Sequence, residues 1–230
     1  MYIENFKKQL KEHGIELSDD QIKQFEDYRI LLQEYNEKIN LTAIIESEEI
    51  YIKHFFDSLI PSFHYKISGS LLDVGAGAGF PSLPLKIIYP DLEVTILEPI
   101  TKRCNFLKVV TNKLGLDVKI VNERAEDYIK ASVVKYDFVT ARAVANMQIL
   151  AELCLPFVKV HGYFVAMKGS RFQEELDASK NALTLLKSSV ENIYEDELDG
   201  ASRATIFIRK HANTPSKYPR NYSQIKQKPL

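Results

Sequence analysis

The chain has 230 residues, 45% of them hydrophobic and 27% charged, which suits one large globular domain with or without a small extension. Its formal net charge of −1 excludes a global basic field, so any nucleic-acid partner has to be held by a local patch. Cys104 and Cys154 lack metal-ligand spacing and fall in apolar helical patterns, which predicts buried free thiols and no metal site. Because no signal-peptide pattern or long uncharged apolar run is visible, we expect a cytoplasmic protein that does not enter a membrane.

The first part of the chain, residues 1–60, is predicted to form a helical extension. Ser18 and Gln21 have the spacing of a capping box, which marks a helix start. A second helix is expected from Ser47 to Leu59, because Pro61 follows and proline disfavours a continuing helix. The apolar residues after the capping box recur at three- and four-residue steps and indicate one buried helix face: Ile22, Phe25, Tyr28, Leu32, Tyr35 and Ile39.

A glycine-rich turn follows the next apolar run. The predicted strand Leu71–Val74 carries Asp73, and glycines then alternate with alanines: Gly75, Gly77 and Gly79, followed by Phe80. A buried strand that runs into a backbone-only loop is how α/β proteins bind nucleotide-like cofactors. The spacing G-x-G-x-G before Phe80 differs from the G-x-G-x-x-G of dinucleotide binders and indicates S-adenosyl-L-methionine (AdoMet), which has no pyrophosphate. We therefore predict a cofactor site here, with a purely structural turn as the alternative.

Strands and helices alternate after this turn. Further strands are predicted at Val94–Leu97, Val118–Val121, Tyr136–Thr140 and Tyr163–Met167. Helices are predicted between them at Pro81–Tyr89, Thr101–Leu114, Ala125–Lys130 and Met147–Val160. Pro156 should kink or shorten the last of these helices. The alternation predicts a parallel sheet with helices on both faces.

Two further segments lie where a nucleotide-like cofactor would meet the sheet. Glu98 ends the second strand, where a carboxylate can accept both hydroxyl groups of a ribose, although an exposed acid at a strand end is the alternative. Ala125 and Glu126 follow the third strand, beside the expected adenine, which a backbone N–H or an acid there can read. A solvated helix start whose acids complement the helix dipole explains these two residues equally well.

The segment after the fourth strand, Thr140–Ala143, is informative for the motifs that it lacks. Methyltransferases acting on nucleic-acid amino groups usually have Asp/Asn-Pro-Pro-aromatic here, and cytosine-C5 enzymes need a nucleophilic cysteine, for which mid-helix Cys154 is a poor candidate. A target atom that needs neither, such as guanine N7, fits, and catalysis would then rest on alignment and desolvation. Arg142 can hold the AdoMet carboxylate or a substrate oxygen, or it is a salt-bridged surface arginine.

Three other polar residues are candidates for substrate contacts. His54 and Asp57 are three residues apart on the second predicted helix and share a face, although such a pair is more often a structural hydrogen bond than a dyad. Lys168 follows the fifth strand, at the same sheet edge as the glycine-rich turn. It can contact an RNA phosphate or guanine O6, or it is an ordinary solvated lysine.

The last third of the chain has a different pattern. A helix near Phe172–Leu186 precedes two strands, Glu191–Leu198 and Arg203–Arg209, which the Asp199-Gly200 turn joins as an antiparallel hairpin. With the five parallel strands, this predicts a seven-stranded, mostly parallel sheet with an antiparallel C-terminal hairpin. That order is expected of a Rossmann-like class I AdoMet-dependent methyltransferase of the α/β class.

The chain is therefore divided into an N-terminal helical extension at 1–60, a methyltransferase domain at 61–212 and a basic tail at 213–230. The tail contains no acidic residue. Lys217 and Arg220 in it are candidate contacts to the phosphates of an RNA substrate. No side chain is assigned a catalytic role.

These residues resemble the RsmG (GidB) family over nearly the whole chain. The matching segments occur in order: Asn40–Thr42, His54–Leu59, Asp73–Pro81, Pro84–Leu85, Lys102–Arg103, Ala141–Ala143, Lys168–Gly169, Tyr218–Arg220 and Lys228–Leu230. The resemblance implies AdoMet-dependent methylation of guanine N7 in bacterial 16S ribosomal RNA. It also implies 16S RNA or an assembling small ribosomal subunit as the partner, and we expect a monomer without a metal.

The family's cofactor contacts carry over by motif to five residues of this chain: Gly75, Phe80, Ala125, Glu126 and Arg142. Two positions depart from the family pattern. Ser82 stands where glycine is usual, in the first helical turn, which tolerates serine. Glu98 stands where aspartate is common, and its longer arm would shift the ribose contact slightly.

Two other functions stay open from the sequence. A small-molecule AdoMet methyltransferase would have a closed pocket and little salt sensitivity, whereas RNA binding through phosphates weakens with salt. A noncatalytic RNA-binding or assembly factor that kept the fold would not bind AdoMet. A dehydrogenase is disfavoured. Counted from Gly75, the dinucleotide fingerprint G-x-G-x-x-G would have its third glycine at position 80, where this chain has Phe80.

Overall fold

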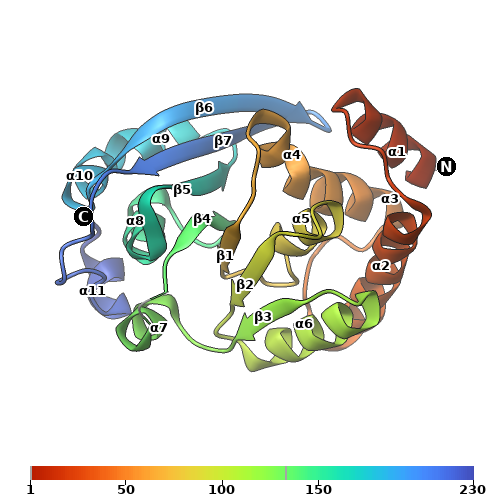
Figure 1. Ribbon diagram of the computed structural model, residues 1–230, viewed down its shortest axis with the longest axis horizontal. Coiled ribbons are helices and arrows are strands. Elements are labelled where there is room, and N and C mark those ends of the chain that lie inside the picture. Colours follow the sequence, from red (N-terminus) through yellow and green to blue (C-terminus); the bar gives the residue numbers. More distant parts are fainter. Residues whose placement is uncertain (1, 133) are drawn as a thin grey trace.

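A seven-stranded sheet in the order β3-β2-β1-β4-β5-β7-β6 runs through the middle of the protein (Figure 1). The computed structural model describes residues 2–132 and 134–230. The strands are β1 Ser70–Val74, β2 Glu93–Leu97, β3 Val118–Val121, β4 Tyr136–Arg142, β5 Val158–Lys168, β6 Ser188–Leu198 and β7 Ala201–Lys210. Strands β1 to β5 pair in parallel, and β7 lies antiparallel between β5 and β6. The predicted fold class is thus confirmed, hairpin included.

The order of the parallel strands reverses between β1 and β4. Asp73 of β1 is in register with Thr140 of β4, so the two strands end side by side at one edge of the sheet. In open parallel sheets, ligands bind outside the carboxyl ends of the strands at such a reversal. The glycine-rich turn after β1 and Arg142 at the end of β4 both lie at this place.

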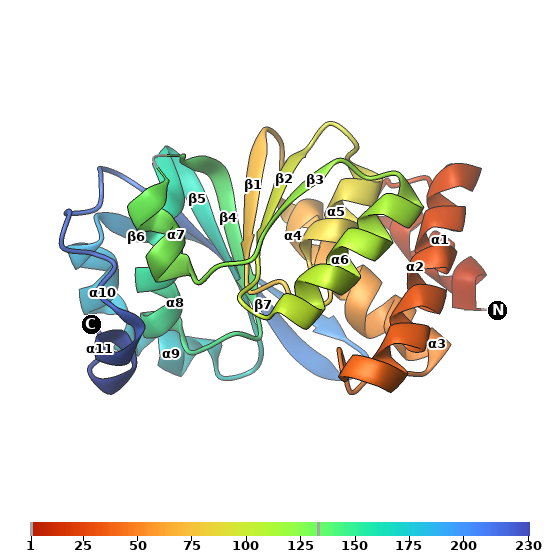
Figure 2. The same ribbon diagram turned by 90° about the horizontal axis from the view of Figure 1, so that it is seen from below.

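Helices cover both faces of the sheet (Figure 2). On one side lie α1 Tyr2–Glu12, α2 Asp19–Ile39, α3 Ser47–Glu49, the π-helical η1 Ile50–Phe56, α4 Asp57–His64, α5 Ser82–Ile88 and α6 Thr101–Leu114. On the other lie α7 Ala125–Ala131, α8 Met147–Cys154, the short η2 Leu155–Phe157, α9 Phe172–Ala178, α10 Lys180–Leu185 and α11 Tyr222–Gln227. The buried apolar residues form two clusters, one under each helix layer.

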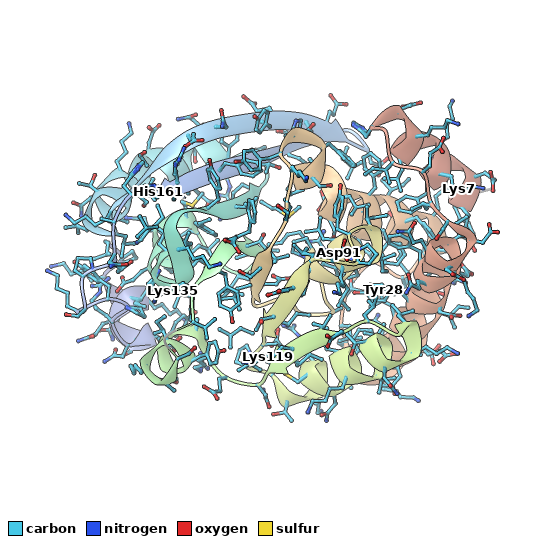
Figure 3. The ribbon with its side chains drawn as sticks, in the orientation of Figure 1. Lys7, Tyr28, Asp91, Lys119, Lys135 and His161 are labelled. Carbon is cyan, nitrogen blue, oxygen red and sulfur yellow. The ribbon has the colours of Figure 1, made fainter. Side chains whose placement is uncertain are left out.

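The N-terminal helices share one core with the sheet. The predicted capping box at Ser18 and Gln21 is present at the start of α2. Phe25 and Tyr28 of α2 are fully buried with Leu83 of α5, and Figure 3 shows Tyr28 between the N-terminal helices and the sheet. The proposed division at residue 60 stays a prediction. No helix in the described ranges is long and apolar enough to cross a membrane.

Three predicted element boundaries are wrong. The helical run from Ser47 continues to His64 with Pro61 inside α4, because the burial of Leu59 and Ile60 outweighs the hydrogen bond that proline cannot donate. Strand β5 begins at Val158, as soon as Pro156 has ended the helical segment, rather than at Tyr163.

The predicted helix at residues 172–186 is also divided at Ser179. The buried Ser179 hydroxyl donates to the Leu176 carbonyl at 2.8 Å and competes with the helical pattern there. Cys104 and Cys154 are free and buried, as predicted.

Candidate active site

A pocket of about 630 Å³ opens at the carboxyl ends of β4 and β5. Its walls come from η1 and α4, from the segments after β4 and β5, from α9 and from the start of β7. The lining contains five cationic side chains and two carboxylates: Lys53, Arg142, Lys168, Arg171 and Arg203, with Asp57 and Glu175. Although the whole chain is close to neutral, this pocket therefore has a positive excess that suits an anionic substrate.

Arg142 contacts three other predicted site residues. Its Nη1 donates to Asp57 Oδ2 at 2.6 Å, and its Nη2 lies 3.2 Å from His54 Nδ1. The guanidinium carbon lies 5.1 Å from the centroid of the Phe80 ring, within cation–π range. Because the Arg142 side chain is only 14% exposed, it is a fixed part of the pocket wall rather than a surface ion pair.

His54 holds Arg142 in place as a neutral imidazole. Arginine only donates hydrogen bonds, so His54 Nδ1 accepts from Arg142, and Nε2–H then donates to Thr42 Oγ1 at 2.8 Å. Burial lowers the pKa of His54 to about 3, with a further contribution from the Arg142 charge. The ring also stacks on Phe80, with centroids 4.4 Å apart. His54 is therefore uncharged near neutral pH and serves as a structural partner of Arg142.

Asp57 joins two arginines from distant parts of the chain. Its Oδ1 accepts from Arg203 Nε at 2.6 Å, while its Oδ2 accepts from Arg142. Arg203 was not predicted as a site residue. The predicted hairpin could have indicated Arg203 as a site residue. A strand antiparallel to β5 begins at the sheet edge where β5 ends, and Lys168 is in register with Ala204, next to Arg203.

Lys168 is not a solvated lysine. Its Nζ donates to the Ala145 carbonyl at 2.7 Å and to Glu175 Oε2 at 2.6 Å, and its side chain is 8% exposed. Glu175 also accepts the Met147 N–H at the start of α8, at 2.9 Å. Glu175 was not predicted as a site residue, although it lies seven residues after Lys168 on the following helix.

The glycine-rich turn lies beside the pocket. Gly75 donates its N–H to the Leu97 carbonyl at 2.8 Å, and a Cβ on Gly75 would meet the pocket residue Val144 at 2.9 Å. Gly77 and Gly79 have φ of +60° and +104°, a region that residues with side chains rarely adopt. A Cβ on Gly77 would meet nothing within 4 Å, whereas one on Gly79 would approach Leu83 at 2.6 Å. Open space at Gly77 fits a ligand placed against the backbone.

This contrast predicts different effects for two alanine substitutions. Gly79→Ala is expected to lower the free energy of unfolding by about 1–3 kcal/mol more than Gly77→Ala, because only the former overpacks the core. Gly77→Ala is expected to lower the affinity for AdoMet, while it lowers the free energy of unfolding less than Gly79→Ala does. Denaturant unfolding and AdoMet titration of both variants measure these effects, and equal losses of stability would contradict the packing argument.

Asp73 presents a buried acceptor at the end of β1. Its Oδ2 accepts the Ser82 N–H at 3.1 Å, while Oδ1 has no hydrogen-bond partner within residues 2–132 and 134–230. Burial raises the pKa of Asp73 to about 7, although the Ser82 N–H acts in the opposite direction. An orphaned carboxylate oxygen beside a glycine-rich turn fits the ammonium group of AdoMet.

Glu98 is buried rather than exposed, with 1% of its side chain accessible. Its Oε2 accepts the Gly77 N–H at 3.0 Å, and its Oε1 accepts the Ile100 N–H at 2.9 Å. The carboxylate therefore ties the second strand to the glycine-rich turn. Each oxygen accepts one backbone N–H and keeps a further lone pair, so the ribose contact stays a prediction.

The residues after β3 also differ from a solvated helix start. Ala125 and Glu126 are both buried at the beginning of α7. Asp127 is exposed and pairs with Lys130 at 3.2 Å, so of the two acids in the first turn of α7 only Asp127 is in solvent. Ala125 and Glu126 thus remain candidates for a contact to adenine, outside the residues that line the pocket.

The two basic residues predicted in the tail have different environments. Lys217 is exposed, with its ammonium group 5.2 Å from the Tyr218 ring centroid. Arg220 pairs with Glu152 of α8, which is fully buried, with Nη2 2.6 Å from Oε2. Neither residue lines the pocket. In the part of the chain that the structure describes, no group of three or more potential metal ligands occurs.

Solved structures with the same fold are distant in sequence. A methyltransferase from Pyrococcus furiosus has a TM-score of 0.56 at 14% identity, covering 79% of this chain and 96% of that one. A mutant of MtNAS, solved in complex with S-adenosylmethionine, has a TM-score of 0.58 at 13% identity, covering 82% of this chain and 72% of that one. These similarities support the fold alone.

Closer relatives match the full length. A ribosomal RNA small subunit methyltransferase G from Streptococcus gordonii is 50% identical over 234 aligned residues, covering 99% of each chain. The protein of the same name from Bacillus cytotoxicus is 49% identical, covering 96% of this chain and 95% of its own. The model of the GidB family, rRNA small subunit methyltransferase G, matches residues 21–202. The chain therefore belongs to the GidB family of rRNA small subunit methyltransferases, which confirms the resemblance found in its sequence.

Proposed function

We propose that this methyltransferase transfers a methyl group from AdoMet to N7 of a guanine in the RNA of the small ribosomal subunit. The observation that carries the proposal is the cationic pocket beside the glycine-rich turn, at the reversal of strand order. The names of the full-length relatives support ribosomal RNA as the substrate. We expect the protein to act as a monomer in the cytoplasm, on 16S RNA or an assembling subunit.

Five parts of the chain are proposed to hold the cofactor. Asp73 would accept the ammonium group, Gly77 gives space against its backbone, and Arg142 would bind the carboxylate. Glu98 would accept the ribose hydroxyls through its remaining lone pairs, and Ala125 with Glu126 would border the adenine. When bound, AdoMet supplies a methyl group on a sulfonium centre, which makes that carbon electrophilic.

The pocket suits a target atom that needs no base. Guanine N7 has a free lone pair and loses no proton on methylation. The residues that line the described pocket include no cysteine, and His54 is neutral and committed to Arg142 and Thr42. We therefore assign alignment and exclusion of water to the pocket walls, and no acid–base step to any side chain.

The RNA must offer its guanine outside a regular helix. Side chains cannot enter the deep, narrow major groove of A-form RNA, where N7 lies. The guanine therefore comes from a loop or is displaced from its stack. Arg171, an exposed lining residue that forms the rim of the pocket, and the exposed Lys217 are the proposed contacts to flanking phosphates.

Removal of one rim charge should change RNA binding and its salt dependence together. Arg171→Ala is expected to weaken RNA binding at low salt and to lower the slope of log affinity against log salt by about 1, because one phosphate contact is lost. The affinity for AdoMet should stay unchanged. Lys180→Ala on α10 removes an exposed charge that does not line the pocket and serves as the control. An equal effect of both variants would contradict a rim contact.

Transfer of a labelled methyl group distinguishes an RNA methyltransferase from a small-molecule methyltransferase and from a noncatalytic assembly factor. Purified protein is incubated with labelled AdoMet and with small-subunit RNA from cells that lack this enzyme. Incorporation into the RNA that decreases as salt increases supports the proposal. AdoMet binding by calorimetry without incorporation into RNA favours a small-molecule methyltransferase, and absence of AdoMet binding favours an assembly factor.

A further inference from the structure

We propose that Glu175, together with Lys168, reads the O6 and N1–H edge of the guanine that is methylated. This inference rests on the proposed function and names two residues that determine which base is accepted. Both side chains line the pocket, Lys168 from the end of β5 and Glu175 from α9.

The hydrogen bonds of Glu175 leave one carboxylate oxygen for a ligand. Both of its internal contacts are made by Oε2, which accepts from Lys168 Nζ at 2.6 Å and from the Met147 N–H at 2.9 Å. Oε1 makes no hydrogen bond with any residue that the structure describes, and the side chain is 28% exposed. This oxygen is therefore available to accept a hydrogen bond from a ligand in the pocket.

The other carboxylate of the pocket is already committed. Asp57 uses Oδ1 for Arg203 and Oδ2 for Arg142, both at 2.6 Å. Among the described residues that line the pocket, Glu175 Oε1 is thus the carboxylate oxygen that accepts no hydrogen bond within the protein. Lys168, at hydrogen-bond distance from the same carboxylate, places a donor beside this acceptor.

The Lys168 donor beside the Glu175 acceptor is complementary to the edge of guanine and not to that of adenine. Guanine presents the acceptor O6 next to the donor N1–H, whereas adenine presents a donor amino group next to the acceptor N1. Lysine only donates and an ionised carboxylate only accepts, so Lys168 pairs with O6 and Glu175 Oε1 pairs with N1–H. Adenine would place like groups against each other at both positions. Because O6 is adjacent to N7, holding this edge also directs N7.

Glu175→Gln tests the pairing while it keeps the side-chain shape. The variant retains an oxygen that can accept the Met147 N–H, but it loses the negative charge. We expect kcat/KM for methylation of small-subunit RNA to fall by about 10–100-fold, as for loss of a charge-assisted hydrogen bond. The AdoMet affinity should stay at the wild-type value, and the protein should stay folded at the assay temperature although Lys168 loses its ion-pair partner. Glu174→Gln, the exposed neighbour, is the matched control and should methylate RNA normally.

Base substitution in the RNA tests the inference without changing the protein. The methylated guanine is replaced by inosine, which keeps O6 and N1–H, or by adenine, which reverses both. The wild-type enzyme should accept inosine nearly as well as guanine and reject adenine. Glu175→Gln should lower the ratio of kcat/KM for the guanine RNA to kcat/KM for the adenine RNA.

Three results would overturn the inference. Wild-type kcat/KM in Glu175→Gln would show that the carboxylate reads nothing. A loss of activity matched by an equal loss of AdoMet binding, or by unfolding at the assay temperature, would assign Glu175 a structural role. Strong rejection of inosine by the wild-type enzyme would place recognition on the N2 amino group instead. Absence of any guanine product with wild-type enzyme would be a different failure, because it rejects the proposed function itself.

Discussion

Replacing Arg220 with alanine is expected to lower the free energy of unfolding by about 3–5 kcal/mol, as for removal of one partner of a buried ion pair. Arg220 donates through Nε and Nη2 to Glu152, at 2.9 and 2.6 Å, and its backbone N–H donates to the same carboxylate at 2.8 Å. Glu152 is 0% exposed. Without the guanidinium, its charge stays buried with only the backbone N–H as a partner, and the tail loses one of its links to α8. Denaturant unfolding measures the loss.

Two further variants separate this role from RNA binding. Lys217→Ala removes an exposed charge three residues earlier and should change stability by less than about 0.5 kcal/mol. Replacing both Glu152 and Arg220 with leucine should recover most of the stability, because no unpaired charge is left. If Arg220→Ala instead kept full stability and lost affinity for RNA, the phosphate contact predicted from the sequence would be right.

Asp73→Asn is expected to weaken AdoMet binding by about 10–100-fold and yet to stabilise the protein above about pH 7. Burial raises the pKa of Asp73 from its ordinary 3.8 to about 7. Between these values the folded protein keeps a proton that the unfolded chain releases, so stability falls as pH rises through this range. Asparagine carries no charge to bury, so the variant should melt at a higher temperature than wild type on the alkaline side.

The same group predicts how cofactor binding depends on pH. The ionised form of Asp73 attracts the AdoMet ammonium, so the affinity of the wild-type protein should rise as pH increases through about 7. Asp73→Asn should bind weakly with no such rise, and Asp91→Asn, at an exposed turn, should behave as wild type. Calorimetry across this pH range decides the point. Wild-type affinity in Asp73→Asn would exclude Asp73 as the ammonium partner.

Much of the fold could be predicted from local patterns. Buried parallel strands are short apolar runs, so Leu71–Val74 and Val94–Leu97 were recognisable, and glycine alternation marked the turn between β1 and α5. The boundaries that failed depend on tertiary contacts. Pro61 stays in a helix because its neighbours are buried, and Ser179 breaks one through its own hydroxyl.

The candidate site was only partly predictable, since its charges are paired across long stretches of sequence. Asp57 and Arg142 were named, but their contact, and the role of Arg203 146 positions after Asp57, depend on the sheet topology. Arg220 looked like a free basic residue because a sequence does not show that its partner, Glu152, is buried in an apolar helix. A lone acid in such a helix is the signal that could have indicated a buried partner.

Identification of the methylated nucleoside tests the proposed transfer to guanine N7. Small-subunit RNA from cells without this enzyme is incubated with the purified protein and with AdoMet labelled in its methyl group. The RNA is then digested and analysed by mass spectrometry. We predict one labelled product, 7-methylguanosine, and its loss when Asp73→Asn replaces the wild-type protein at low AdoMet. A labelled product other than 7-methylguanosine, or none with the wild-type protein, would contradict methylation of guanine N7 by this protein.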